Sequence, residues 1–122
     1  MKQRILVVED DQIIQLDLRR HLKRLDYDVV GTASSGEEAI AKAAQLQPNL
    51  ILMDIRLEGA MDGIEAARQI QSARQVPVIY LTAQSGAVTR NSKQEVEPRV
   101  AKPFKQTELQ AAIEKALRTQ QA

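Results

Sequence analysis

Short apolar runs rich in isoleucine, leucine and valine alternate with segments of helical periodicity along this chain, and no other feature constrains the fold as strongly. The runs lie at residues 5–8, 29–33, 50–53, 77–81 and 100–101. A continuous apolar run of this length is typical of a strand buried on both faces, as in a parallel sheet. The alternation therefore predicts an α/β fold, a doubly wound sheet of five parallel strands with helices on both faces.

Helix signals follow most of these runs. Leu18 and Leu22 recur at helical spacing after the first run, and Ser35 with Glu38 matches a capping box that opens a second helix. Apolar residues at helical spacing also follow residue 63, and a last helix opens at Thr107. Each of these segments supplies a helix that can cover one face of the sheet.

The segment at 84–98 departs from this pattern, because its glycine, threonine, asparagine and serine residues are poor helix formers. We therefore expect a fourth helix that is short or irregular. The polar residues 119–122 predict a frayed tail. With 122 residues and neither a repeat nor an internal linker, the chain fits a single domain that spans residues 1–122.

Composition excludes several classes of function. The formal net charge is +1, so there is no overall field to hold nucleic acid, and direct nucleic-acid binding is not expected. The absence of cysteine excludes disulfides, thiolate catalysis and Cys-ligated zinc. No apolar run approaches membrane-spanning length, and the first residues do not form a secretory signal. We expect a soluble, cytoplasmic protein without a membrane partner.

Polar residues follow the predicted strands where a binding site is expected. In an open parallel sheet, ligands bind outside the carboxyl ends of the strands. The residues at those ends are Glu9, Asp10 and Asp11 after the first strand, Asp54 after the third, Thr82 after the fourth and Lys102 after the fifth. The fold would bring these side chains, distant in sequence, to one edge of the sheet.

Carboxylates gathered in one cleft repel one another, and this determines what the site can do. Without a cation, one of them is expected to hold a proton. Mg²⁺ suits such a site because it binds a few carboxylates and keeps several waters. With an ammonium and a hydroxyl close by, the arrangement is that of a phosphoryl-transfer site in which Asp54 attacks phosphorus to form an aspartyl phosphate.

Four motifs together resemble the response-regulator receiver domains of two-component signalling systems. They are Val7-Val8-Glu9-Asp10-Asp11, Leu52-Met53-Asp54, Leu81-Thr82-Ala83 and Lys102-Pro103-Phe104. Their order and spacing agree with the family over nearly the whole chain. The resemblance implies a flavodoxin-like fold and a protein that is a switch and not an enzyme, catalysing only its own phosphorylation and slow dephosphorylation.

The resemblance also implies a role for each matching residue. Asp54 looks like the phosphoacceptor, and Thr82 and Lys102 look like the hydroxyl and the ammonium that engage the phosphoryl group. Asp10, Asp54 and the backbone carbonyl of Arg56 look like ligands of Mg²⁺, with Glu9 supporting the metal through water. The implied partners are a histidine kinase or phosphotransfer protein, whose phosphohistidine is the donor, and an unknown downstream protein; a dimer linked to phosphorylation is also possible.

Two positions depart from the family pattern. Arg56 lies in a loop where many receivers have Met-Pro, and it places a positive side chain beside the site, a change that can alter dephosphorylation. Arg99 stands three residues before Lys102, where the family usually has an aromatic ring that moves with the threonine. Burying an unpaired guanidinium is costly, so we expect Arg99 to stay outward. The usual switch should then be altered, and so should the usual partner face, which is formed by the fourth helix, the fifth strand and the fifth helix.

Three other classes of protein share parts of this pattern. A phosphohydrolase of the haloacid-dehalogenase type needs a second Asp two residues after its nucleophile, and here that position is Arg56. A flavodoxin-like electron carrier needs a Ser/Thr-rich phosphate loop after the first strand, where this chain has three acids that would repel a flavin phosphate. A receiver-like binding module that signals without phosphorylation stays open, because of the altered segment that ends at Arg99.

Overall fold

A computed structural model describes residues 2–82, 99–102 and 104–121. The elements follow in the order β1 (Arg4–Val8), α1 (Gln12–Arg24), β2 (Asp28–Ala33), α2 (Gly36–Leu46), β3 (Leu50–Asp54), α3 (Gly63–Ala73), β4 (Val78–Thr82), β5 (Arg99–Ala101) and α4 (Gln106–Gln121). The strands form one sheet in the order β2-β1-β3-β4-β5, and every pair is parallel. The predicted five-stranded α/β fold is confirmed.

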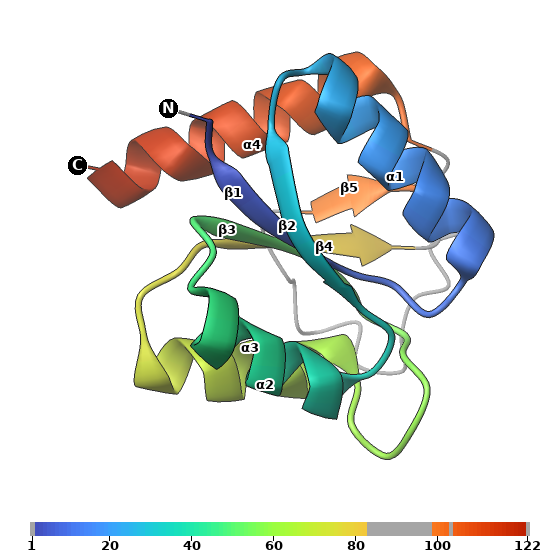
Figure 1. Ribbon diagram of the computed structural model, residues 1–122, viewed down its shortest axis with the longest axis vertical. Coiled ribbons are helices and arrows are strands. Elements are labelled where there is room, and N and C mark those ends of the chain that lie inside the picture. Colours follow the sequence, from blue (N-terminus) through green and yellow to red (C-terminus); the bar gives the residue numbers. More distant parts are fainter. Residues whose placement is uncertain (1, 83–98, 103, 122) are drawn as a thin grey trace.

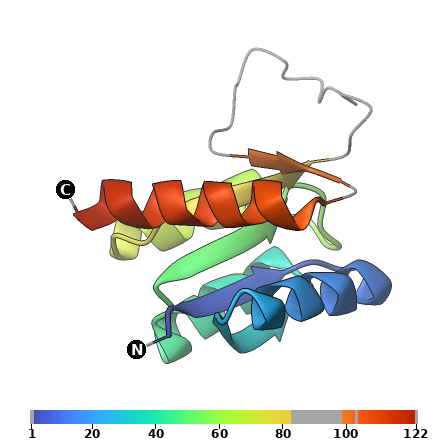
Figure 2. The same ribbon diagram turned by 90° about the horizontal axis from the view of Figure 1, so that it is seen from above.

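Helices cover both faces of the sheet and create two apolar cores. On one face, Leu18 and Leu22 of α1 and Leu109 and Ile113 of α4 pack on the strands. On the other face, α2 and α3 contribute mainly alanines, which allow these helices to lie close to the sheet and to each other. Figure 1 shows the two layers on either side of the sheet, and Figure 2 looks down onto the face of α1 and α4.

Side chains at the carboxyl edge of the sheet cap the first three helices. The Oδ1 of Asp11 accepts from the amides of Ile13 and Ile14, the Oγ of Ser35 accepts from Glu38, and Asp62 accepts from an amide in the first turn of α3. Satisfying these amides fixes where each helix starts relative to the strand before it. The helix starts therefore surround the edge at which the polar strand-end residues lie.

Several predicted boundaries shift. The helix α4 starts at Gln106, one residue before the predicted start, and continues to Gln121 where we expected a frayed tail from residue 119. Thr119 stays helical with its hydroxyl donating to the carbonyl of Lys115 (2.9 Å). The irregular fourth helix predicted at 84–98 lies outside the described residues. No helix in the described part of the chain is long and apolar enough to cross a membrane.

Candidate functional site

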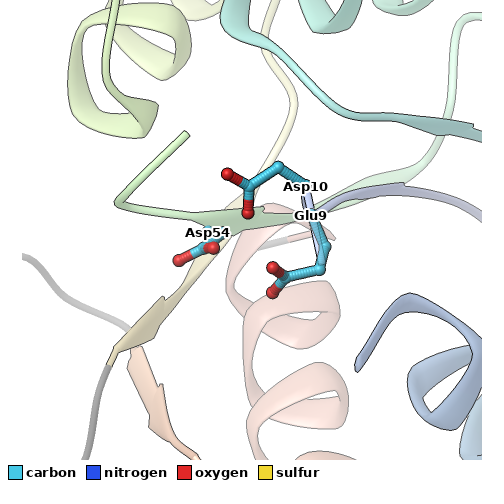
Figure 3. A group of neighbouring side chains, drawn as sticks. All are labelled: Glu9, Asp10 and Asp54. Carbon is cyan, nitrogen blue, oxygen red and sulfur yellow. The ribbon is translucent and has the colours of Figure 1, made fainter. Parts of the chain in front are cut away.

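Three carboxylates meet at the carboxyl edge of the sheet. Glu9 and Asp10 follow β1, and Asp54 ends β3, the strand that pairs directly with β1. One carboxylate oxygen from each lies within 4.8 Å of the others. Figure 3 shows the three side chains gathered around one space. The sheet thus brings together the acids that the sequence placed at two separate strand ends.

Glu9 is the most buried of these acids, with 1% of its surface exposed. Its backbone amide donates to the carbonyl of Ala33 on β2 (2.9 Å), and its Oε2 accepts from the amide of Asp11 (3.0 Å). Its Oε1 lies 2.9 Å from the Nζ of Lys102, an ion-pair contact. Glu9 is therefore held from three directions and faces Lys102 from below the surface of the site.

Lys102 bridges two of the carboxylates. Its Nζ lies 3.2 Å from the Oδ2 of Asp54 as well as 2.9 Å from Glu9. The lysine follows directly on β5, and its backbone amide donates to the carbonyl of Thr82 (2.8 Å). The pairing of β5 with β4 therefore delivers the ammonium to the acids, as the strand-end argument predicted.

Burial sets the protonation of this cluster. It raises the pKa of the Glu9 carboxyl from 4.5 to about 7, because the opposing contacts with Lys102 and the amide of Asp11 do not recover the lost hydration. Burial alone would lower the pKa of the Lys102 ammonium, but the hydrogen bond to Glu9 and the charge of Asp54 outweigh it and raise that pKa. Glu9 is therefore the acid expected to hold a proton when no cation is bound.

The loop after β3 folds back against Asp54. The Oδ1 of Asp54 accepts from the amide of Arg56 (3.2 Å), and the amide of Gly63 donates to the carbonyl of Ile55 (2.7 Å). A Cβ on Gly63 would lie 2.0 Å from the carbonyl oxygen of Asp54, so only glycine fits at this helix start. This close approach fixes the loop that carries Arg56, whose own side chain is exposed.

Thr82 and Arg99 lie on the neighbouring strands. Asp54 pairs with Leu81 across β3 and β4, so Thr82 lies one residue further along β4, and it is half-buried. Arg99 begins β5 and is exposed, as predicted for a guanidinium in place of an aromatic ring. The sequence offers Glu95 and Glu97 as acids that could pair with it, and both lie outside the described residues.

Residues beyond the predicted set also shape the site. A polar groove of about 510 Å³ opens beside Asp10 and is lined by side chains of α1, α2 and the loop after β3. One lining residue, Gln15 of α1, donates through its Nε2 to the backbone carbonyl of Glu9 (3.0 Å). A glutamine in the first turns of a helix has no distinguishing signal in sequence, and neither this contact nor the packing of Gly63 was predicted.

The donor atoms suit a hard divalent cation. Carboxylate oxygens are the ligands that Mg²⁺ takes in proteins, and it needs only one or two of them together with water. Here Asp10 is partly exposed and makes no hydrogen bond or ion pair within the described residues, so its oxygens are available as ligands. Burial keeps the pKa of Glu9 raised even though Lys102 is in contact with it, so the cluster can accept further positive charge. The residues therefore fit the metal.

The response regulator receiver domain model matches residues 5–114 of the chain. The chain belongs to this family. Among curated proteins, it is 37% identical to the transcriptional regulatory protein PdtaR of Mycobacterium tuberculosis over 116 residues, covering 93% of the chain and 56% of that protein. It is 33% identical to the phyllosphere-induced regulator PhyR of Methylorubrum extorquens, covering 100% of the chain and 46% of that protein.

Solved receiver domains have the same fold. The response regulator PhyR from Brucella abortus matches with a TM-score of 0.88 at 30% identity, over 99% of this chain and 50% of that one. The receiver domain of a modulated diguanylate cyclase from Desulfovibrio desulfuricans matches with a TM-score of 0.84 at 32% identity, over 99% and 98% of the two chains. The chain spans about half the length of the curated relatives it matches first.

Proposed function

We propose that this receiver domain takes a phosphoryl group on Asp54 from the phosphohistidine of a histidine kinase or phosphotransfer protein. The observation that carries the proposal is the joint placement of Glu9, Asp10 and Asp54 within 4.8 Å, with Lys102 in contact with two of them. The family supports it, because receivers are the phosphate-accepting half of two-component systems. Asp54 is buried at the end of β3, with 5% of its surface exposed.

Asp10, Asp54 and the backbone carbonyl of Arg56 would hold Mg²⁺, and Glu9 would support it. When bound, the metal supplies positive charge to the phosphoryl oxygens as negative charge shifts between donor and acceptor. The amide of Arg56 already donates to Asp54. The loop after β3 is thus held against the acceptor before a metal arrives.

The chain's own residues carry the transfer. A carboxylate oxygen of Asp54 attacks phosphorus, the phosphorus–nitrogen bond of the phosphohistidine breaks, and the imidazole leaves with the electron pair of that bond. Lys102 then exchanges its contact with the Asp54 carboxylate for one with the phosphoryl oxygens. The hydroxyl of Thr82 donates a hydrogen bond to the same group.

The output is expected to be a protein–protein contact. PdtaR, PhoP and ResD are named transcriptional regulatory proteins, and PhyR from Bartonella quintana is described as an anti-anti-sigma factor. A phosphorylated receiver shifts the population between two arrangements of one surface. We propose that the partner here is a downstream regulatory protein or a second copy of the chain. We also propose that the phosphoryl transfer and this contact take place in the cytoplasm.

A second candidate is a receiver that signals through its unphosphorylated surface. The exposed Arg99 favours it, because the aromatic ring that usually moves with the threonine is replaced by a charged side chain. In that case the fold would present a fixed surface to a partner. The two candidates differ in whether the acceptor is labelled at all.

Labelling with acetyl phosphate and Mg²⁺, followed by intact mass, tests the proposal. The wild type should gain one phosphoryl group that hydroxylamine removes, and Asp54→Asn should gain none. Asp62→Asn is the matched control, since it alters an acid that caps α3, and asparagine is an equally good cap. Labelling of Asp54→Asn at the wild-type level would overturn the assignment, and an unlabelled wild type would favour the second candidate.

A further inference from the structure

The side chain of Gln15 ties the first turns of α1 to the acidic connection, residues 9–11 between β1 and α1, which carries Glu9 and Asp10. Its Nε2 donates to the carbonyl of Glu9 (3.0 Å), while its backbone amide donates to the carbonyl of Asp11 (2.9 Å). One residue therefore holds the carbonyls on both sides of Asp10. Within the described residues, no other side chain from outside this connection binds its backbone.

Asp10 itself has no contact that could fix its direction. Its carboxylate makes no hydrogen bond or ion pair in the part of the chain that the structure describes, and the residue is partly exposed. Glu9 differs, because the amide of Asp11 and the ammonium of Lys102 hold its side chain. The direction in which Asp10 points is therefore set by the backbone on either side of it.

The hydrogen bond from Gln15 is not needed to start the helix. Asp11 already caps α1 through two amides, at 2.9 and 3.2 Å. Gln15 acts instead on the carbonyl of Glu9, which belongs to the peptide group that joins Glu9 to Asp10. Without the donor, this carbonyl would turn toward water in the polar groove that Gln15 and Asp10 both line, and the peptide plane would turn with it.

We infer that Gln15 is a positioning residue for the metal site, holding Asp10 in the direction from which it contacts Mg²⁺. The inference rests on the proposed function, which makes Asp10 a metal ligand. Gln15 touches neither the acceptor nor the metal and acts only through the backbone of the acidic connection. Loss of one neutral hydrogen bond should weaken Mg²⁺ binding by roughly threefold to tenfold.

The test compares Gln15→Met with Gln12→Met in the full chain. Methionine has nearly the length and volume of glutamine, but its side chain has no N–H donor. Gln12 lies on the same helix and lines the same groove, and its side chain makes no hydrogen bond to any residue that the structure describes. Each protein is titrated with Mg²⁺ alone, and binding is followed by NMR from the shifts of the amide resonances of residues 9–11. Labelling rates with acetyl phosphate are then measured across a range of Mg²⁺ concentrations.

We expect the Mg²⁺ half-saturation of Gln15→Met to rise by about threefold to tenfold, with Gln12→Met unchanged. The labelling rate of Gln15→Met at saturating Mg²⁺ should return to within about twofold of wild type, because the defect lies in metal binding alone. Gln15→Asn, which keeps the amide but shortens its reach, should show the same pattern and serves if the methionine variant does not fold.

The inference is overturned if Gln15→Met binds Mg²⁺ as wild type does, if Gln12→Met shows an equal loss, or if saturating Mg²⁺ does not restore the rate. Mg²⁺ binding by a wild type that does not label refutes the proposed function and leaves the role of Gln15 to be decided by the titration. A wild type that labels normally beside an unaffected Gln15→Met refutes the role of Gln15 alone. A wild type that binds no Mg²⁺ overturns both.

Discussion

The Glu9 carboxyl should give the unfolding free energy of the metal-free domain a pH dependence that a single substitution can isolate. Burial raises the pKa of Glu9 from 4.5 to about 7 in the folded protein. Between these values the folded state binds a proton that the unfolded chain has released. Stability from this group is therefore fully present below pH 4.5 and is lost as the pH rises through 7.

The size of the effect follows from the two pKa values. Each pH unit between 4.5 and 7 corresponds to about 1.4 kcal/mol, which gives a loss on the order of 3 kcal/mol. Little of this is screened by solvent, because only 1% of Glu9 is exposed. Glu38, whose pKa is lowered mainly by the amide of Ser34, has the opposite sign and gains stability as the pH rises.

The contribution of Glu38 cancels when wild type is compared with Glu9→Gln, since glutamine does not titrate and Glu38 is present in both proteins. Urea unfolding with EDTA present, at intervals from pH 4.5 to 8, would give the difference in free energy of unfolding. We expect wild type to lose about 3 kcal/mol relative to the variant over this range. Parallel stability curves for the two proteins would refute the protonation of Glu9.

Two more substitutions test the contacts around Asp54, and Gly36→Ala serves as the control for the second. Lys102→Met leaves the carboxylates without their ammonium. It should lower the free energy of unfolding by on the order of 2 kcal/mol at pH 8 with EDTA, but by less at pH 5, where Glu9 is neutral. Equal losses in urea unfolding at both pH values would contradict this. Gly63→Ala places a Cβ 2.0 Å from the Asp54 carbonyl and should cost more than about 2 kcal/mol. Gly36→Ala, which meets only the flexible Met61 side chain at 3.0 Å, should cost under about 1 kcal/mol by the same measurement.

The strand-end residues were predictable because a parallel sheet leaves few choices. Once the apolar runs are strands of one sheet, every chain segment leaving a strand emerges at the same edge. Glu9, Asp10, Asp54 and Lys102 had to meet there, whatever the details of the loops. The same argument predicted that one acid would hold a proton, because it depends only on the number of charges that meet.

Which acid holds that proton was not predictable, because it depends on depth below the surface. Glu9 and Asp10 are adjacent in sequence, yet Glu9 is buried and Asp10 is partly exposed. Their difference comes from the turn between β1 and α1, in which the amide of Asp11 draws the Glu9 carboxylate inward. The roles of Gln15 and Gly63 were not predictable either, because both depend on the path of a loop backbone.

Counting charges links the protonation of the site to its proposed function. Three ionised carboxylates and one ammonium would leave a net charge of about −2, which a proton on Glu9 reduces to −1 and a divalent cation brings to zero. Proton and metal are therefore alternative ways to neutralise one buried cluster. A phosphoryl group replaces the single charge of Asp54 with nearly two, so the metal-bound site again has an excess of about −1. Under the proposed function, that excess attracts the hydroxyl of Thr82, and this attraction is the force available to rearrange the strand-end loops when Asp54 is phosphorylated.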